Sequence, residues 1–160
     1  MEMSKIELKD ITLDYTDQGN VYHALDGVTF SVEEGEFVSL IGSSGCGKST
    51  TLSILAGLNN PKNGSFLIDG QETRGTGKDR GVVFQHYSLF PWMSVRKNIE
   101  FGIKQNFQRL SKKELTAKAM EYLEKVGLKG FENKYPYQLS GGMQQRAMIA
   151  MAMSCKPDLL

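Results

Sequence analysis

The chain has 160 residues and a formal net charge of +1, with 40% hydrophobic and 23% charged residues. This size fits one domain with a core of its own, and the balanced charge excludes a nucleic-acid-coating protein, whose surface is usually strongly basic. Two cysteines are too few for a disulfide framework and fit a reducing compartment, and the longest apolar run, at 147–153, is far too short to cross a bilayer.

The N-terminal part of the chain has the pattern of strands and loops. Alternating apolar and polar residues predict a half-buried strand at 6–13 and a second strand at 28–32. Between them, residues 15–27 are rich in turn-forming side chains and predict a loop. A turn at 33–36 then leads into the apolar run at 37–41, which is predicted to be a buried strand that ends where the next motif begins.

The most informative motif lies at 42–49 and has the form G-x-x-x-x-G-K-[ST], which is a phosphate-binding loop when it joins a strand to a helix. Glycines let the backbone turn its N–H groups toward an anion, and the following helix adds its positive end. Lys48 is expected to reach the terminal phosphates and to act in catalysis, and the Ser49 hydroxyl is expected to help hold Mg²⁺. The alternative is a Gly/Ser turn without a ligand. The candidate nucleotide-binding residues are Gly42, Ser43, Ser44, Gly45, Cys46, Gly47, Lys48, Ser49 and Thr50.

Beyond this loop the pattern predicts a helix at 48–58 and short strands at 65–68 and 81–84. A second Gly-Lys pair, at Gly77 and Lys78, has no Ser or Thr after it and no first glycine at the required spacing. We therefore expect this pair to lie in an ordinary surface loop.

A more polar, helical pattern covers residues 88–139. Ser111 and Glu114 have the spacing of a capping box, which marks a helix start. Apolar residues then recur at helical spacing until Gly127. The chain thus divides into three predicted parts: a nucleotide-binding core with a β subdomain (1–87), a helical insert (88–139), and a last helix with the return to the core (140–160).

A second glycine-containing motif, Leu-Ser-Gly-Gly-Met-Gln-Gln-Arg at 139–146, opens that last helix. Ser140 is placed to cap the helix, and Gly141 and Gly142 allow backbone N–H groups to approach a ligand closely. A loop of this kind at a helix N-terminus is a second anion-binding device. Two such devices suggest one nucleotide bound from both sides, unless the motif is an ordinary helix start.

With both motifs, the whole chain resembles the ATPase subunit of ATP-binding-cassette transporters. The octet resembles the family's LSGGQ signature, with Met143 in place of the usual glutamine. The resemblance implies an α/β fold with a P-loop NTPase-type core, an antiparallel β subdomain and a helical insert, truncated before the later core strands. It also implies that ATP with Mg²⁺ is bound and hydrolysed to drive solute transport.

The same resemblance assigns roles to single residues outside the phosphate loop. Gln85 corresponds to the family's Q-loop glutamine, which contacts Mg²⁺ and the attacking water. Tyr15 matches the aromatic that stacks on adenine, with Tyr22 as the alternative.

In the family, two subunits pair head to tail around the nucleotide. The resemblance therefore implies that Ser140, Gly141 and Gly142, together with Gln144, contact a nucleotide held by the phosphate loop of a second ATPase subunit.

By resemblance, the segment at 87–95 receives a helix of a transmembrane permease subunit. Phe90, Trp92 and Met93 suit an apolar socket for such a helix, or they pack the core of the insert itself; the sequence leaves both open. The protein is accordingly expected in the cytoplasm, peripheral on the inner face of the cell membrane. The sequence around Pro91 and Trp92 resembles that of the ATPase subunits of nitrate, sulfonate or taurine importers.

The family places a buried strand from about residue 156 onward, followed by the Mg²⁺-binding aspartate and a glutamate that polarises water. We expect these 160 residues alone to be marginally stable and to hydrolyse little or no ATP.

Two other functions stay open: a nucleotide-binding module without hydrolysis, and a soluble family member in translation or DNA repair. The near-neutral charge argues against the latter.

Overall fold

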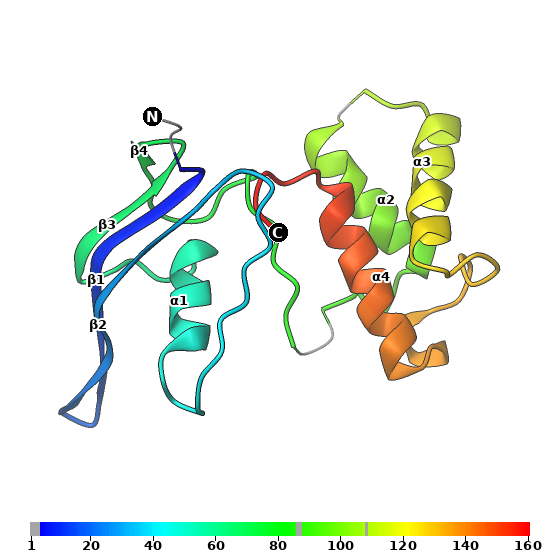
Figure 1. Cartoon of the computed structure of the whole chain (residues 1–160). Coiled ribbons are helices and arrows are strands. Elements are labelled where there is room, and N and C mark those ends of the chain that lie inside the picture. The colour runs from blue at the N-terminus through cyan, green and yellow to red at the C-terminus, as the bar shows by residue number, and fades with distance from the viewer. Residues whose placement is uncertain (1–3, 86–87, 108) are drawn as a thin grey trace. The chain divides into compact units, whose positions relative to one another are not determined.

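The computed structural model describes residues 4–85, 88–107 and 109–160. The chain falls into two compact units, Met1–Gly77 and Lys78–Leu160 (Figure 1). Tyr87, the first residue of the expected permease-binding segment, lies outside the described residues. Among the helices that the structure describes, none has the length and apolar character to span a membrane.

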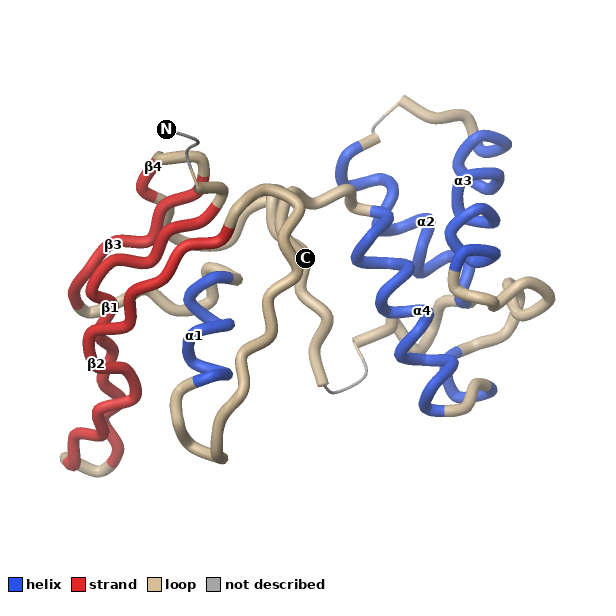
Figure 2. Tube along the Cα trace, viewed as in Figure 1, coloured by secondary structure: helices blue, strands red, loops and turns tan. Residues whose placement is uncertain are grey.

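The first unit is built on an antiparallel sheet with the strand order β2-β1-β3-β4 (Figure 2). Its strands are β1 (Ile6–Asp17), β2 (Asn20–Val32), β3 (Asn63–Ile68) and β4 (Gln71–Glu72). Ile6 and Leu8 turn inward, and after an irregularity in the strand register so do Ile11 and Leu13. Apolar and polar residues therefore alternate on each side of that irregularity, which is the pattern that predicted the strand. The buried apolar side chains of the sheet are Ile6, Leu8, Ile11, Leu13, Leu25, Phe66 and Ile68. The predicted antiparallel β subdomain is confirmed.

The loop predicted at 15–27 is wrong, because β1 and β2 form one long hairpin. Pairing continues through Tyr15 and Tyr22 to a tight turn at Gln18 and Gly19. The end of this hairpin is exposed on both faces, so its residues carry no apolar alternation that would identify a strand.

Helix α1 (Lys48–Leu55) packs against the sheet and buries Thr51 and Ile54. It ends earlier than predicted, before Gly57, whose N–H donates to the carbonyl of Ile54.

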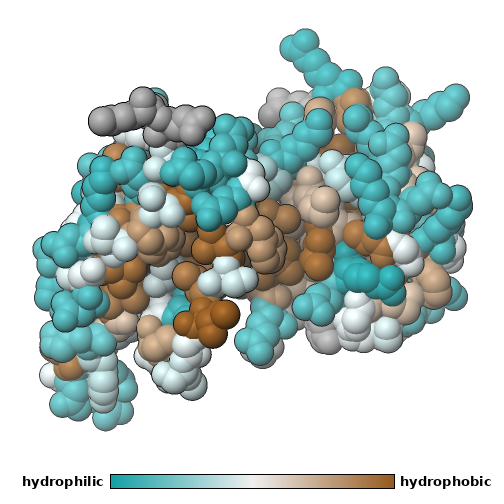
Figure 3. Space-filling view, viewed as in Figure 1, coloured by the Kyte–Doolittle hydropathy of each residue, from teal (hydrophilic) through white to brown (hydrophobic). Residues whose placement is uncertain are grey.

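The apolar run at 37–41 is not the predicted buried strand. Phe37 is 92% exposed and Ile41 is 93% exposed. Hydrophobic side chains are visible at the surface of the protein in Figure 3. A strand is stabilised by a hydrogen-bonded neighbour, and none pairs with this run in the described part of the chain.

The described residues of the second unit contain three α-helices and a short 3-10 helix. They are α2 (Val95–Asn106), α3 (Lys112–Lys125), α4 (Gly141–Ser154) and η1 (Pro136–Gln138). The capping box is confirmed, since the Ser111 hydroxyl accepts from Glu114 and the Glu114 carboxylate accepts from the Ser111 N–H. One continuous core joins the helices. Its buried residues are Leu89, Val95, Ile99, Ile103, Leu115, Ala119, Leu123, Leu128, Leu139, Ala147, Met148 and Ala150.

The strand predicted at 81–84 is also not formed. A single parallel bridge joins Arg80 to Leu159, and the Gly81 N–H donates to the Leu159 carbonyl at 2.8 Å. Residues 158 and 159 thus form backbone hydrogen bonds with residues 79 and 81.

Candidate functional site

The phosphate loop turns directly into α1 through a glycine that no other residue can replace without strain. Gly47 is the N-cap of α1 and has a left-handed φ of 90°. A Cβ atom there would lie 2.6 Å from Leu25 Cδ2 and 2.8 Å from the Ala24 carbonyl oxygen. Because glycine has no side chain to cap the helix, the first amide groups of α1 are open to a ligand.

The ammonium group of Lys48 lies over the backbone of the same loop. Its Nζ donates to the carbonyl oxygens of Gly42 at 2.9 Å and Ser43 at 2.6 Å, and lies 3.4 Å from Cys46 Sγ. The loop therefore encloses a positive charge next to the positive end of a helix, and charge-assisted hydrogen bonds to a phosphate group are stronger than these bonds to neutral carbonyls.

Several of the remaining residues of the motif lie at the protein surface. Ser44, Gly45 and Ser49 are exposed, and the Thr50 carbonyl accepts from the Ser53 hydroxyl at 2.7 Å within α1. In the described residues, no three His, Cys, Asp or Glu side chains gather as a metal site. A hydroxyl such as that of Ser49 suits Mg²⁺, which in nucleotide sites is commonly held by few protein oxygens together with water and phosphate oxygens.

Tyr15, the candidate adenine-stacking residue, lies in the same unit as the phosphate loop. Tyr15 is 44% exposed, and its hydroxyl accepts a hydrogen bond from Asn59 Nδ2 at 2.9 Å. Tyr22 lies opposite Tyr15 across the hairpin and is 56% exposed. Asn59 was not predicted from the sequence, because no local pattern distinguishes it from Asn60 beside it.

The motif at 139–146 starts α4 as predicted. The Ser140 hydroxyl oxygen accepts from the Met143 N–H at 3.4 Å, which leaves its own proton free to be donated to a ligand. Gln144 lies in the first turn of α4. Its backbone N–H donates to the Ser140 carbonyl at 2.9 Å, and its side-chain Nε2 donates to the Leu139 carbonyl at 3.3 Å. Gly141 and Gly142 are exposed in the first turn.

Gln85 and the aromatic segment after it belong to the second unit, and Gln85 is exposed. Phe90 packs edge-on against Phe101 at 4.8 Å between ring centroids and lies 5.5 Å from Trp92. Trp92 is 69% exposed and is not part of the helical core. Phe101 also lines a surface groove of about 210 Å³, together with Met93, Lys97, Glu100 and Lys104. Trp92 therefore lies open on the surface, whereas Leu89 joins the core.

Asn98, which was not predicted from the sequence, organises the turn that carries Trp92. Its side chain is fully buried. Its Nδ2 donates to the carbonyls of Phe90, Met93 and Ser94 at 3.1–3.2 Å, and its Oδ1 accepts from the Phe90 N–H at 2.7 Å. A polar residue on the apolar face of a predicted helix is the signal that would have found it.

Arg146, within the same octet as Ser140, joins two helices of the second unit. Its Nη1 donates to the carbonyls of Val126 at 3.0 Å and Gly127 at 3.5 Å, where α3 has just ended. A cation at this position donates hydrogen bonds to carbonyl groups that have no partner within the helix, and it interacts favourably with the negative end of the α3 dipole. It thereby ties the start of α4 to its neighbour.

Comparison with known proteins identifies the relatives of this chain. A family model described as ABC transporter matches residues 25–160. The nitrate import ATP-binding protein NrtD of Synechocystis sp. is 47% identical over 155 residues, which cover 97% of this chain and 58% of that protein. An uncharacterized ABC transporter ATP-binding protein of Methanocaldococcus jannaschii is 46% identical, over 98% of this chain and 58% of its own length. The chain thus spans little more than half of these relatives.

A bicarbonate transport ATP-binding protein, CmpC of Synechococcus elongatus, is 48% identical over 89% of this chain and 21% of its own length. The fold is similar to a solved dimeric structure of the ATP-binding cassette MJ0796 in a post-hydrolysis state bound to ADP and Pi. That similarity has a TM-score of 0.87 and 36% identity, over 95% of this chain and 70% of the other.

Proposed function

Because the chain belongs to the ABC transporter family, we propose that it is the ATP-binding part of a transporter's ATPase subunit and holds MgATP at residues 42–50. The observation that carries the proposal is the Lys48 ammonium group inside a loop that ends at an uncapped helix N-terminus. An anion with several charges is the ligand that this arrangement suits best.

In this proposal each part of the loop has one task. The first amide groups of α1 donate to phosphate oxygens, and Lys48 exchanges the carbonyls of Gly42 and Ser43 for the terminal phosphates. Ser49 and Gln85 would hold Mg²⁺ through their side-chain oxygens, and the ion would neutralise negative charge on the phosphate groups. Tyr15 stacks on the base, with Tyr22 as the alternative.

The helix N-terminus of α4 is proposed to contact the nucleotide of a second ATPase subunit. Support comes from the free hydroxyl proton of Ser140 and the exposed Gly141 and Gly142, and the MJ0796 cassette is itself dimeric. In this scheme residues 1–87 form the nucleotide-binding core, 88–139 the helical insert, and 140–160 the signature helix with the return to the core.

The exposed Trp92 and the groove lined by Met93 and Phe101 are the proposed contact for a permease subunit on the inner face of the cell membrane. Trp92→Ala should release the protein from membranes that contain the permease. Tyr137→Ala, which changes another exposed aromatic of the same unit, should leave it bound. If the wild-type protein co-purified with ribosomes or DNA and not with membranes, the result would favour the role in translation or DNA repair.

The proposed solute class is small anions, taken up by import. Relatives named for nitrate import and bicarbonate transport match at 47% and 48% identity, and sulfonates stay within this class. Uptake of labelled nitrate, bicarbonate and taurine by cells with and without the intact transporter tests the assignment.

The main experiment measures MgATP affinity by calorimetry. Lys48→Ala should weaken binding by about 1.5–3 kcal/mol through lost charge-assisted hydrogen bonds. Lys78→Ala is the matched control, because Lys78 also follows a glycine but is exposed outside the loop, and it should bind like the wild type. Equal affinities of the wild type and Lys48→Ala would overturn the proposal.

A second candidate is nucleotide binding without hydrolysis. The phosphate loop and α1 carry no acidic side chain, so the carboxylate that activates water must come from elsewhere. ATPase assays on this chain and on a longer form of the protein distinguish the two. We expect little or no turnover by the 160 residues alone.

A further inference from the structure

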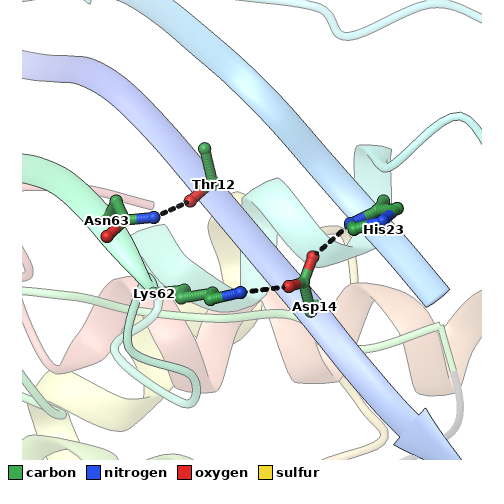
Figure 4. Close-up of polar contacts among 5 residues, drawn as sticks. All are labelled: Thr12, Asp14, His23, Lys62 and Asn63. Atoms are coloured by element: carbon green, nitrogen blue, oxygen red, sulfur yellow. Dashed lines mark hydrogen bonds and ion pairs between the residues drawn. The ribbon is translucent and has the colours of Figure 1, made fainter. Parts of the chain in front are cut away.

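The segment that follows α1, at residues 59–63, is fastened to β1 at several points. Lys62 forms an ion pair with Asp14 at 2.6 Å, and Asn63 Nδ2 donates to the Thr12 hydroxyl at 2.9 Å (Figure 4). The Lys62 N–H also donates to the Thr12 carbonyl at 2.8 Å. Asp14 accepts from His23 of β2 at 2.7 Å, so the segment is tied to both strands of the hairpin.

Asn59 stands at the start of this segment and connects β1 to α1. Its Nδ2 donates to the Tyr15 hydroxyl and to the Ser53 hydroxyl, both at 2.9 Å. Its backbone N–H donates to the Ser53 carbonyl at 3.2 Å. Both protons of one amide group are therefore used to hold the ring of Tyr15 to the helix that begins at the phosphate loop.

This contact separates the two candidate aromatics. Tyr15 and Tyr22 are similarly exposed and lie opposite each other on the hairpin. Only Tyr15 is bonded through its hydroxyl to the segment after α1, as far as the described residues show. A ring held at its far end keeps one orientation, whereas a free exposed tyrosine must lose rotamer freedom when a ligand stacks on it.

We propose that Asn59 is a positioning residue that sets the Tyr15 ring at a fixed distance from the phosphate loop, and so makes the site selective for a triphosphate with a base attached. This inference rests on the proposed function, in which Tyr15 stacks on the base. Asn59 itself touches no substrate. It acts through the Tyr15 hydroxyl on one side and through Ser53 on α1 on the other.

The proposal separates binding of the base from binding of the phosphates. The phosphate loop holds the triphosphate whether or not Tyr15 is fixed. Losing the Asn59 hydrogen bond should therefore weaken MgATP but not magnesium tripolyphosphate. A merely structural role in the packing of α1 would disturb the loop and weaken both ligands alike.

The test is a double-mutant cycle on the full chain, with Asn59→Ala, Tyr15→Phe and the double variant, and with affinities for MgATP and magnesium tripolyphosphate measured for each. Each single variant should weaken MgATP about threefold to tenfold, the usual effect of one lost hydrogen bond. The double variant should lose no more than either single variant, because both remove the same contact. The affinity for tripolyphosphate should be unchanged. Asn60→Ala, next in sequence and exposed, is the control and should bind MgATP like the wild type.

Three results would overturn the proposal: no change in MgATP affinity for Asn59→Ala, equal losses for both ligands, or additive losses in the double variant. Failure of the proposed function looks different. In that case the wild type binds neither ligand, or Lys48→Ala binds MgATP as tightly as the wild type.

Discussion

The two units of this protein bury their apolar side chains to different extents. In the helical unit, Val95, Ile99 and Ile103 of α2 are all fully buried in one core. In the sheet unit, Phe37 and Ile41 are almost fully exposed just before the phosphate loop. A helix satisfies its backbone hydrogen bonds within itself, whereas a strand depends on a neighbour. The difference teaches that local sequence signals suffice to predict the helices of the helical unit. The structure of residues 37–41, which lead into the phosphate loop, depends instead on neighbouring strands that are distant in the sequence.

The largest expected effect tests this contrast with one type of substitution in each unit. Ile99→Ala should lower the free energy of unfolding by about 2–5 kcal/mol, because it leaves a cavity in a closed core. Ile41→Ala should change it by less than about 0.5 kcal/mol, since the side chain is 93% exposed. Urea unfolding followed by circular dichroism measures both, and similar losses at the two positions would contradict the contrast.

A second effect compares two glycines of the phosphate loop, both with left-handed φ values. Gly45→Ala adds a Cβ that meets no atom within 4 Å, so only backbone strain of about 1 kcal/mol is expected. Gly47→Ala adds the same strain and also a clash with Leu25 and the Ala24 carbonyl. Gly47→Ala should therefore destabilise the sheet unit more in urea unfolding. The reverse order would show that the loop is not held against β2 as described.

A smaller effect is expected at the start of α4 in the helical unit. Ser140→Ala removes the helix cap and should lower the free energy of unfolding by about 0.5–2 kcal/mol, toward the low end because the capping bond is 3.4 Å long. Ser111→Ala breaks a reciprocal capping box and should cost at least as much. A Ser140→Ala variant as stable as the wild type in urea would show that the cap does not stabilise the helix.

The smallest effect is a dependence on pH. The hydroxyl and backbone N–H of Ser111 donate to the Glu114 carboxylate and hold the pKa of Glu114 below its ordinary value. A pKa lowered by folding stabilises the protein above the ordinary pKa of about 4.3, and this stabilisation is lost as the pH falls through that value and below the folded-state pKa. Glu114→Gln should therefore flatten the loss of stability between about pH 5 and pH 2.

Unfolding free energies at pH 7 and pH 3 check this expectation. Glu121→Gln is the control, because it removes a charge from the same helix without touching the cap. Identical pH profiles of the wild type and Glu114→Gln would contradict the prediction.

Features set by neighbouring residues could be predicted from the sequence. The turn into α1 at Gly47, the capping box at Ser111 and Glu114, and the cap at Ser140 all depend on residues a few positions apart. The candidate loop around Lys48 follows from the same short-range spacing.

Features set by distant partners could not be predicted. Asn59 donates a hydrogen bond to Tyr15 across 44 positions. The position of Asn98 on the apolar face of a helix could have marked it, but the backbone groups of the turn that it bonds could not be predicted. The run at 37–41 has the composition of a buried strand, yet its side chains are exposed because no described strand pairs with it. The exposed tip of the hairpin was missed because solvent on both faces removes the alternating pattern.

The central claim is that the amide groups of residues 42–50 and the Lys48 ammonium group bind a triphosphate. Titration of the ¹⁵N-labelled full chain with MgATP, followed by two-dimensional NMR, tests it most directly. The account predicts saturable shifts of the amide signals of residues 42–50 in the wild type, and much weaker binding for Lys48→Ala. Signals that do not move at saturating MgATP, or that move equally in Lys48→Ala at the same concentrations, would contradict it.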